Sequence, residues 1–263
     1  MNARGWVGVD GRCALVGMVH LLPLPGSPGW AGSVSGIIDA ARRDAEALGE
    51  GGCDALLVEN MGDVPYLRGA VGPETIASMA VVTAAVGELG LPVGVQVLAG
   101  ANHAALAVAL AAGATFIRAE AFAYAHVADE GILQATAGPL LRARAAASAD
   151  VAIWADVHKK HAAHAITADL ELDELARGHA FCGADALIVT GSATGRPTEP
   201  DDIILAQEAG LPVAVGSGVT PSDAGQLAAL ADALIVGTAL KVDGDWRRAV
   251  DVDRVRAIRA AMG

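Results

Sequence analysis

The sequence predicts a single α/β domain, a (β/α)8 or TIM barrel with a parallel eight-stranded core. The chain has 263 residues, a typical length for one barrel of this class. Eight short runs rich in Val, Ile and Leu recur along it, and each is followed by an Ala-rich segment with helical spacing. No linker rich in Pro, Gly or Ser divides residues 1–263, so one domain is expected.

Each run is long enough for one strand, and its apolar residues are continuous, as expected for strands covered on both faces. In chain order the predicted strands are ALVGMVHL from Ala14, DALLVEN from Asp54, PVGVQVL from Pro92, FIRAEA from Phe116, VAIWADVH from Val151, DALIVTG from Asp185, PVAVGSG from Pro212 and DALIVGT from Asp232. An open doubly wound sheet usually has fewer units. The DALLV motif returns as DALIV in the sixth and eighth runs, which a duplicated half-barrel or a shared strand consensus would explain.

Composition excludes several classes of protein. Hydrophobic residues make up 53% of the chain, which excludes a disordered chain. The formal net charge of -12 argues against a nucleic-acid partner. The 3 cysteines have no CxxC spacing, and the chain shows no signal peptide and no apolar run of the ~20 residues that span a bilayer. We therefore expect a cytoplasmic protein without a transmembrane segment.

Polar residues gather at the ends of the predicted strands, where a (β/α)8 barrel builds its active site. Buried charges are costly unless they pair or act on a ligand. The candidate catalytic residues are His20, Glu59, Arg118, Glu120, Asp156, His158 and Lys160. The candidate substrate-binding residues are Asn60, Asp63, Gln96, Thr190 and Ser192.

The segment ADVHKKHAAH leaves several interpretations open. Asp156 and His158 alternate along one strand and therefore point the same way. Together with Glu59 they could bind a divalent metal such as Zn, Mn, Fe or Mg, act as acid and base without metal, or be hydrogen-bonded structure. Lys159 or Lys160 could form a Schiff base or be a solvated charge. The sequence identifies no other cofactor.

Two glycine-containing strand ends predict a phosphate site. GSGVTP ends the seventh run and GTALK ends the eighth, which is where barrels of this class often bind phosphate. The glycines let backbone approach the anion, the hydroxyls add donors, and a helix beginning near Pro221 would offer its N-terminus. Glycine that only serves a tight turn is the alternative. The candidate residues are Gly216, Ser217, Gly218, Gly237 and Thr238.

Several stretches together resemble the BtpA (BtpA/SgcQ) family. They are GMVHLLPLPGSP, DALLVENMGDVPY, GVQVLAGAN, FIRAEAF, ADVHKKHA, ADALIVTGSATGRPT, VAVGSGVTP and ADALIVGTALKVDG, from about Gly17 to Trp246. The resemblance implies a barrel of the ribulose-phosphate-binding type and a homo-oligomer. Some members are linked to photosystem I accumulation, and others to sugar metabolism. It supplies no reaction.

Three functions remain open. The first is an enzyme that moves protons on a small phosphorylated sugar or sugar-like compound, by isomerase, epimerase, aldolase or lyase chemistry. The second is a metal-dependent hydrolase or nucleoside-type enzyme on the same barrel. The third is a non-catalytic assembly or regulatory factor, as in photosystem I biogenesis, which would require a partner surface.

Overall fold

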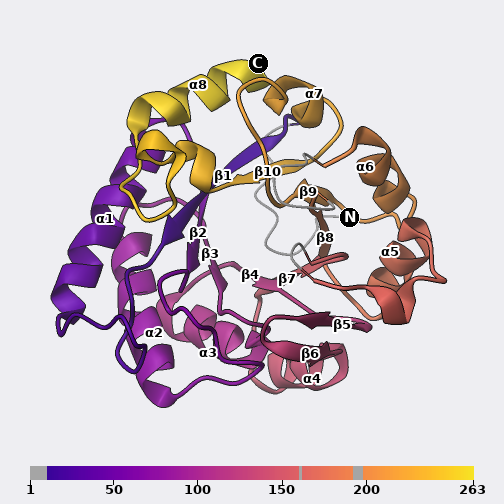
Figure 1. The fold of residues 1–263 in the computed structure, drawn as a ribbon, viewed down its shortest axis with the longest axis horizontal. Helices are drawn as coiled ribbons and strands as arrows, with labels where there is room; N and C mark the ends of the chain where they lie inside the picture. Colours follow the sequence, from indigo (N-terminus) through magenta and orange to yellow (C-terminus); the bar gives the residue numbers. More distant parts are fainter. Residues whose placement is uncertain (1–10, 160–161, 192–197) are drawn as a thin grey trace.

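A computed structural model describes residues 11–159, 162–191 and 198–263. Eight parallel strands close into a barrel in the order β1-β10-β9-β8-β7-β4-β3-β2 (Figure 1), which confirms the predicted fold class. The strands are β1 (Ala14–His20), β2 (Ala55–Glu59), β3 (Val93–Gln96), β4 (Phe116–Ala119), β7 (Ala152–Asp156), β8 (Ala186–Val189), β9 (Val213–Val215) and β10 (Ala233–Val236). Each lies within one of the runs that the sequence predicts.

Helices surround the barrel on its outside, as Figure 1 shows. They are α1 (Val34–Glu50), α2 (Pro73–Gly87), α3 (Asn102–Ala112), α4 (Ala137–Ala146), α5 (Leu172–Phe181), α6 (Pro200–Gln207), α7 (Ala224–Ala228) and α8 (Val252–Met262). In α1 the Ser33 side chain caps the first turn by accepting from the Gly36 N–H at 3.0 Å. Short 3-10 turns occur at η1 (Ala165–Thr167), η2 (Thr238–Leu240) and η3 (Val242–Gly244). Among the described residues, no helix has the length and apolar character needed to cross a bilayer.

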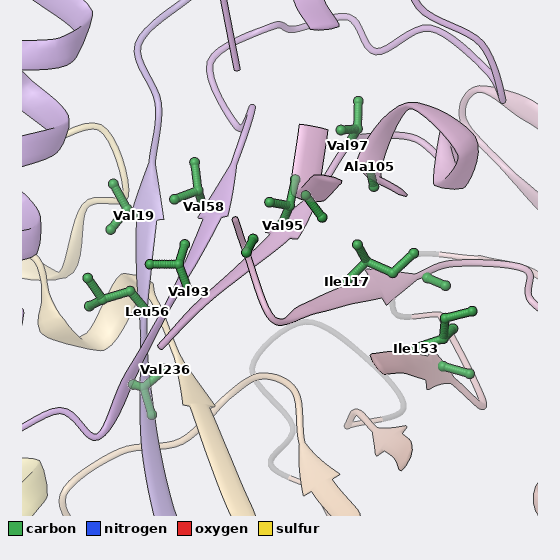
Figure 2. Packing of buried hydrophobic residues seen from close by; sticks show 14 of the residues in the cluster. Val19, Leu56, Val58, Val93, Val95, Val97, Ala105, Ile117, Ile153 and Val236 are labelled. Atoms are coloured by element: carbon green, nitrogen blue, oxygen red, sulfur yellow. The ribbon is translucent and has the colours of Figure 1, made fainter. Parts of the chain in front are cut away.

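The larger apolar core lies between the strands and the helices. Alternate strand residues such as Val58, Val95 and Ile117 face outward into this layer (Figure 2). All three are fully buried. Burying each such side chain contributes about 1.5–3 kcal/mol, so this layer supplies much of the energy that holds the helices on the barrel.

The other strand residues fill the inside of the barrel. They form a separate cluster of Ala14, Val16, Met18, Ala55, Leu57, Phe116, Ala152, Trp154, Ala186, Ile188, Ala214, Ala233 and Ile235. The rings of Phe116 and Trp154 stack with centroids 4.2 Å apart. A Cβ at Gly94 would lie 2.2 Å from the Phe116 ring, so glycine is needed there. The lower barrel is therefore closed by apolar side chains.

The repeated DAL motif has a structural role at the strand starts. The carboxylates of Asp54, Asp185 and Asp232 each accept a backbone N–H from the neighbouring strand, at 2.8, 2.9 and 2.9 Å respectively. The same residue makes the same bond three times, as a shared strand consensus would give, and duplication of a half-barrel stays a prediction.

An antiparallel hairpin that the sequence did not predict follows β4. Its strands are β5 (Ala125–Ala128) and β6 (Gly131–Gln134). Val127 and Ala163 exchange backbone hydrogen bonds of 3.1 and 2.7 Å, which attach the hairpin to the loop after β7.

Candidate active site

The carboxyl ends of the strands meet at one end of the barrel, which we call the mouth. The inward-facing positions alternate along each strand, and beyond the apolar cluster the next inward position on every strand is polar or glycine. These eight residues form the upper ring: His20, Glu59, Gln96, Arg118, Asp156, Thr190, Gly216 and Gly237. His20 is in register with Glu59, and Glu59 with Gln96. All eight are site residues that the sequence predicts, and the fold brings them to the mouth, next to the apolar cluster inside the barrel.

Arg118 and Asp156 form a bidentate pair across β4 and β7. The guanidinium donates from Nε to Oδ2 at 3.0 Å and from Nη2 to Oδ1 at 2.8 Å. Its third nitrogen, Nη1, lies 3.5 Å from the carbonyl oxygen of Gly216 on the far side of the ring. Burial acts to lower the pKa of Arg118, but the nearby carboxylates outweigh burial and hold the pKa above its usual value. The ring therefore contains one permanent positive charge.

Glu59 and His20 make a second contact in the ring. Glu59 Oε2 lies 3.5 Å from His20 Nε2, and both side chains are buried. Burial, together with repulsion from Glu120 and Asp156, raises the pKa of Glu59 to about 7. Burial and the charge of Lys241 lower the pKa of His20 to about 3. Although the distance would suit an ion pair, His20 is neutral near pH 7, and the contact joins an uncharged imidazole to a carboxyl group in mid-titration.

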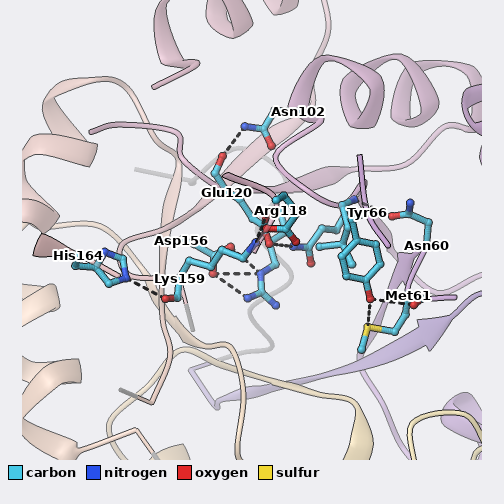
Figure 3. A network of polar contacts seen from close by, with 12 residues as sticks. Asn60, Met61, Tyr66, Asn102, Arg118, Glu120, Asp156, Lys159 and His164 are labelled. Atoms are coloured by element: carbon cyan, nitrogen blue, oxygen red, sulfur yellow. Dashed lines mark hydrogen bonds and ion pairs between the residues drawn. The ribbon is translucent and has the colours of Figure 1, made fainter. Parts of the chain in front are cut away.

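Glu120 lies beside the ring and is held by Lys159. Lys159 Nζ lies 3.4 Å from Glu120 Oε2 and 3.3 Å from Oε2 of Glu130, in the turn between β5 and β6. Gln96 Nε2 donates to Glu120 Oε1 at 3.4 Å. Figure 3 shows Arg118, Glu120, Asp156 and Lys159 converging in one network. Burial raises the pKa of Glu120, against the opposing effect of Lys159.

The sequence places Lys160 among the candidate catalytic residues, offers Lys159 only as an alternative Schiff-base lysine, and does not indicate Glu130. Lys160 lies outside the described residues, as does Ser192, so both assignments stay predictions. Position along the chain does not distinguish two adjacent lysines. No sequence pattern indicates Glu130, because the hairpin that carries it to the mouth has no clear strand pattern of its own.

Asn60 and Asp63 fasten the loops around the mouth. Asn60 Oδ1 accepts the Leu98 N–H at 2.7 Å, and its Nδ2 donates to Asp63 Oδ2 at 3.0 Å. Asp63 Oδ1 accepts the Leu24 N–H at 2.7 Å. These bonds connect the loops that follow β1, β2 and β3. The predicted contact of both residues with substrate stays a prediction.

Three histidines gather between the hairpin and the loop after β7. The ring of His164 lies 4.3 Å from that of His158 and 5.5 Å from that of His126, measured between centroids. Burial, with repulsion from the neighbouring histidines, lowers the pKa of both His126 and His158 to about 4. Thr190 donates its hydroxyl to the His158 carbonyl at 2.8 Å. His158 therefore lies beside the ring in a packed histidine cluster, where its own pKa is lowered.

The predicted metal ligands are engaged by other side chains. Asp156 is held by Arg118, and Glu59 contacts His20. Within residues 11–159, 162–191 and 198–263, no three His, Cys, Asp or Glu side chains are grouped in a way that could hold a metal ion. A metal bound by Glu59, Asp156 and His158 stays a prediction.

The glycines of the predicted phosphate site have a packing role as well. A Cβ on Gly216 would lie 2.5 Å from Ile188 Cγ2 and 2.9 Å from Thr190 Cγ2, and one on Gly237 would lie 2.9 Å from the His20 ring. Both glycines therefore leave room for a side chain of the upper ring, Thr190 at Gly216 and His20 at Gly237. Gly218 has a φ of +79°, which favours glycine. Ser217 is half-buried and Thr238 is exposed.

The helix expected near Pro221 begins later and is short. It is α7, which starts at Ala224 because the preceding loop forms its own hydrogen bonds. Asp223 accepts from the backbone N–H and the hydroxyl of Thr220, at 2.7 and 2.9 Å. A phosphate at this loop would depend on the glycine backbone and the nearby arginine rather than on a long helix.

A model of the BtpA family matches residues 12–263. The chain is 42% identical to an uncharacterised protein of Thermococcus kodakarensis, over 94% of both chains. It is 39% identical to an uncharacterised mitochondrial protein of Caenorhabditis elegans, covering 93% of this chain and 91% of that one. It is also 39% identical to the photosystem I biogenesis protein BtpA of Synechocystis sp., covering 94% and 87%.

Solved structures share the fold at low identity. 3-Hexulose-6-phosphate synthase superimposes with a TM-score of 0.58 at 15% identity, covering 95% of this chain and 100% of that one. Thiamine phosphate pyrophosphorylase from Pyrococcus furiosus gives a TM-score of 0.55 at 18% identity, covering 95% and 97%. These likenesses show a (β/α)8 barrel.

Proposed function

The chain belongs to the BtpA family, and on that premise we propose that it is an enzyme that moves a proton beside the carbonyl group of a small phosphorylated compound of the sugar type. The observation that supports this most directly is the state of Glu59. A general base is most effective when its pKa lies near the working pH, and the pKa of Glu59 is raised to about 7. Its partner His20 remains neutral.

The chemistry needs a base and a group that stabilises charge on the carbonyl oxygen. The Glu59 carboxylate would take a proton from the carbon next to the carbonyl, and the electron pair of that C–H bond would form an enolate. A neutral imidazole is a good hydrogen-bond donor to such an oxygen, and His20 lies beside Glu59 in the same register. Return of the proton to the former carbonyl carbon, with the proton of the adjacent hydroxyl passing to the carbonyl oxygen, would isomerise the compound. Return to the original carbon from the opposite face would epimerise it, and neither step needs an external oxidant or reductant.

Arg118 supplies the balancing charge. Its guanidinium is fixed by Asp156, so it would stabilise the enolate without having to reorganise. The Nη1 atom lies towards Gly216. This direction supports a phosphate at the loops after β9 and β10, formed by Gly216–Gly218 and Gly237–Thr238.

Hydrogen exchange tests the proposal without a known product. The protein would be incubated in D2O with a panel of aldose and ketose phosphates, and loss of the C–H signal next to the carbonyl followed by proton NMR. We expect exchange with at least one compound, faster as pH rises through about 7. Glu59→Gln should slow it by about 10²–10⁴-fold, the usual size of a general-base effect.

Glu88→Gln is the matched control, because Glu88 is exposed on the outer surface. This variant should exchange as fast as the wild type. Equal exchange rates for Glu59→Gln and the wild type, or no exchange with any compound, would contradict the proposal.

The printed name of the Synechocystis relative favours a second candidate, a factor that assists assembly of a protein complex. That role gives no reason for a buried ring of acids, an arginine and a neutral histidine. A pull-down that recovers a stoichiometric partner, unchanged by Glu59→Gln and Arg118→Met, would favour assembly over catalysis.

A further inference from the structure

Two buried acceptor oxygens beside the upper ring have no hydrogen-bond donor. They are Gln96 Oε1 and Glu120 Oε2, and neither has a hydrogen-bond partner in the described part of the chain. Gln96 is 2% exposed and Glu120 is 5% exposed. Glu120 Oε2 lies 3.4 Å from Lys159 Nζ, an ion-pair distance that does not meet hydrogen-bond geometry.

The neighbours of Gln96 fix the orientation of its amide. The carboxylate oxygens of Glu120 only accept, so the Gln96 nitrogen must face Glu120, where it donates at 3.4 Å. The amide oxygen consequently points away from Glu120, and Gln96 is in register with Glu59 on the neighbouring strand. Buried acceptors without donors cost free energy, and where they persist in a native protein they call for an explanation such as a ligand.

The two oxygens define the chemistry of a complementary group. Acceptors need O–H or N–H donors. A cationic amine would be repelled by Lys159, which contacts Glu120, and by Arg118, which is charged and follows Gln96 around the ring. A neutral hydroxyl group can donate a hydrogen bond to either oxygen without that repulsion.

We propose that Gln96 and Glu120 form a subsite that binds hydroxyl groups of the substrate. The substrate then carries a hydroxylated chain on the side of β3 and β4. This inference rests on the proposed function, which places the phosphate at β9 and β10. In the strand order of the barrel, β3 lies opposite β9 and β4 lies opposite β10. The substrate therefore crosses the mouth, with its phosphate at one side, its carbonyl over Glu59 and His20, and its hydroxyls against Gln96 and Glu120.

Binding of unreactive probes tests this orientation. Ribitol 5-phosphate carries hydroxyls along a five-carbon chain, pentyl phosphate has the same chain without them, and inorganic phosphate has no chain. By calorimetry we expect wild-type protein to bind ribitol 5-phosphate at least about 10-fold more tightly than pentyl phosphate, as two added hydrogen bonds would give.

Gln96→Met keeps the side-chain length and removes the acceptor. It should reduce the preference for the hydroxylated probe to about 2-fold, while leaving the affinity for inorganic phosphate unchanged. Gln134→Met is the matched control, because Gln134 is exposed on β6. Glu120→Gln preserves the shape of the side chain but not its charge, and it should reduce the preference for the hydroxylated probe by a smaller factor. It is the alternative test if Gln96→Met does not fold.

Equal affinity of wild-type protein for the hydroxylated and alkyl probes would overturn the subsite. A folded Gln96→Met protein that keeps the full preference would overturn it too. If the protein exchanges hydrogen in D2O but binds ribitol 5-phosphate and pentyl phosphate equally, the subsite is wrong and the proposed reaction stands. If the protein prefers ribitol 5-phosphate but exchanges no hydrogen, the proposed reaction is wrong and the subsite stands. If it binds none of the three probes, both the phosphate site and the hydroxyl subsite are wrong.

Discussion

At the scale of single residues, the properties of Glu59 depend on its surroundings. Burial dominates the rise in its pKa, and Arg118 only partly offsets burial because that arginine is already paired with Asp156. A buried carboxyl group with a raised pKa lowers the stability of the folded protein. Such a loss of stability is common at sites that serve activity.

The raised pKa of Glu59 predicts a pH-dependent stability. Between the unfolded value of 4.5 and the folded value of about 7, the native state holds a proton that the unfolded chain has lost, so stability falls as pH rises through this window. Glu59→Gln should therefore be more stable than the wild type at pH ~8, by up to about 3 kcal/mol, and no more stable at pH ~4. Urea unfolding at the two pH values measures this. A gain of the same size at both values would contradict it.

The Arg118–Asp156 pair predicts a large single-variant effect. Arg118→Met leaves Asp156 buried without its partner and should lower the free energy of unfolding by about 3–5 kcal/mol. The double variant Arg118→Met, Asp156→Leu should recover most of that loss, because no charge remains buried at the site. Chemical denaturation of the three proteins checks this, and a double variant as unstable as Arg118→Met would refute it.

At the scale of elements, the β5–β6 hairpin is attached to the mouth by a side chain. Lys159 reaches Glu130 in the hairpin turn as well as Glu120. The hairpin also contacts the loop after β7 through Val127 and Ala163. The sequence around it has no strand pattern, because neither four-residue strand, AHVA or GILQ, alternates strictly between apolar and polar residues.

Lys159→Met should release this hairpin. Two buried carboxylates would lose their common cation, so we expect amide hydrogen exchange over residues 125–134 to accelerate by about 10-fold or more. Hydrogen-exchange mass spectrometry measures this segment directly. Arg142→Met on the exposed face of α4 should leave the segment unchanged, and an unchanged hairpin in Lys159→Met would show that the lysine does not hold it.

At the scale of the whole molecule, the barrel closes where the last strand meets the first. Ala14 to Gly17 of β1 pair with Ala233 to Val236 of β10. Lys241, just after β10, is buried and lies 2.5 Å from Asp44 of α1, which also accepts the Val250 N–H at 2.8 Å. These contacts join α1 to the segment that follows β10.

Lys241→Met should destabilise the whole barrel by about 3–5 kcal/mol, because it leaves Asp44 buried without its counter-ion. The loss should appear as a lower midpoint of a single unfolding transition. Arg256→Met breaks an exposed pair with Glu50 and should cost about 1 kcal/mol or less. Equal effects of the two variants would contradict this role of Lys241.

The sequence by itself determined the strands, the barrel and the upper ring. Each strand is a local run, and inward positions repeat every second residue, so the residue that ends each inward row could be identified without knowing its neighbours. His20, Glu59, Arg118 and Asp156 are predicted from the sequence as polar residues at the ends of these runs. Only the tertiary structure decided the partners: that Lys159 binds Glu130, and that Lys241 binds Asp44 across 197 positions of the chain. Those pairings depend on which distant segments meet when the barrel closes, and no local pattern encodes that meeting.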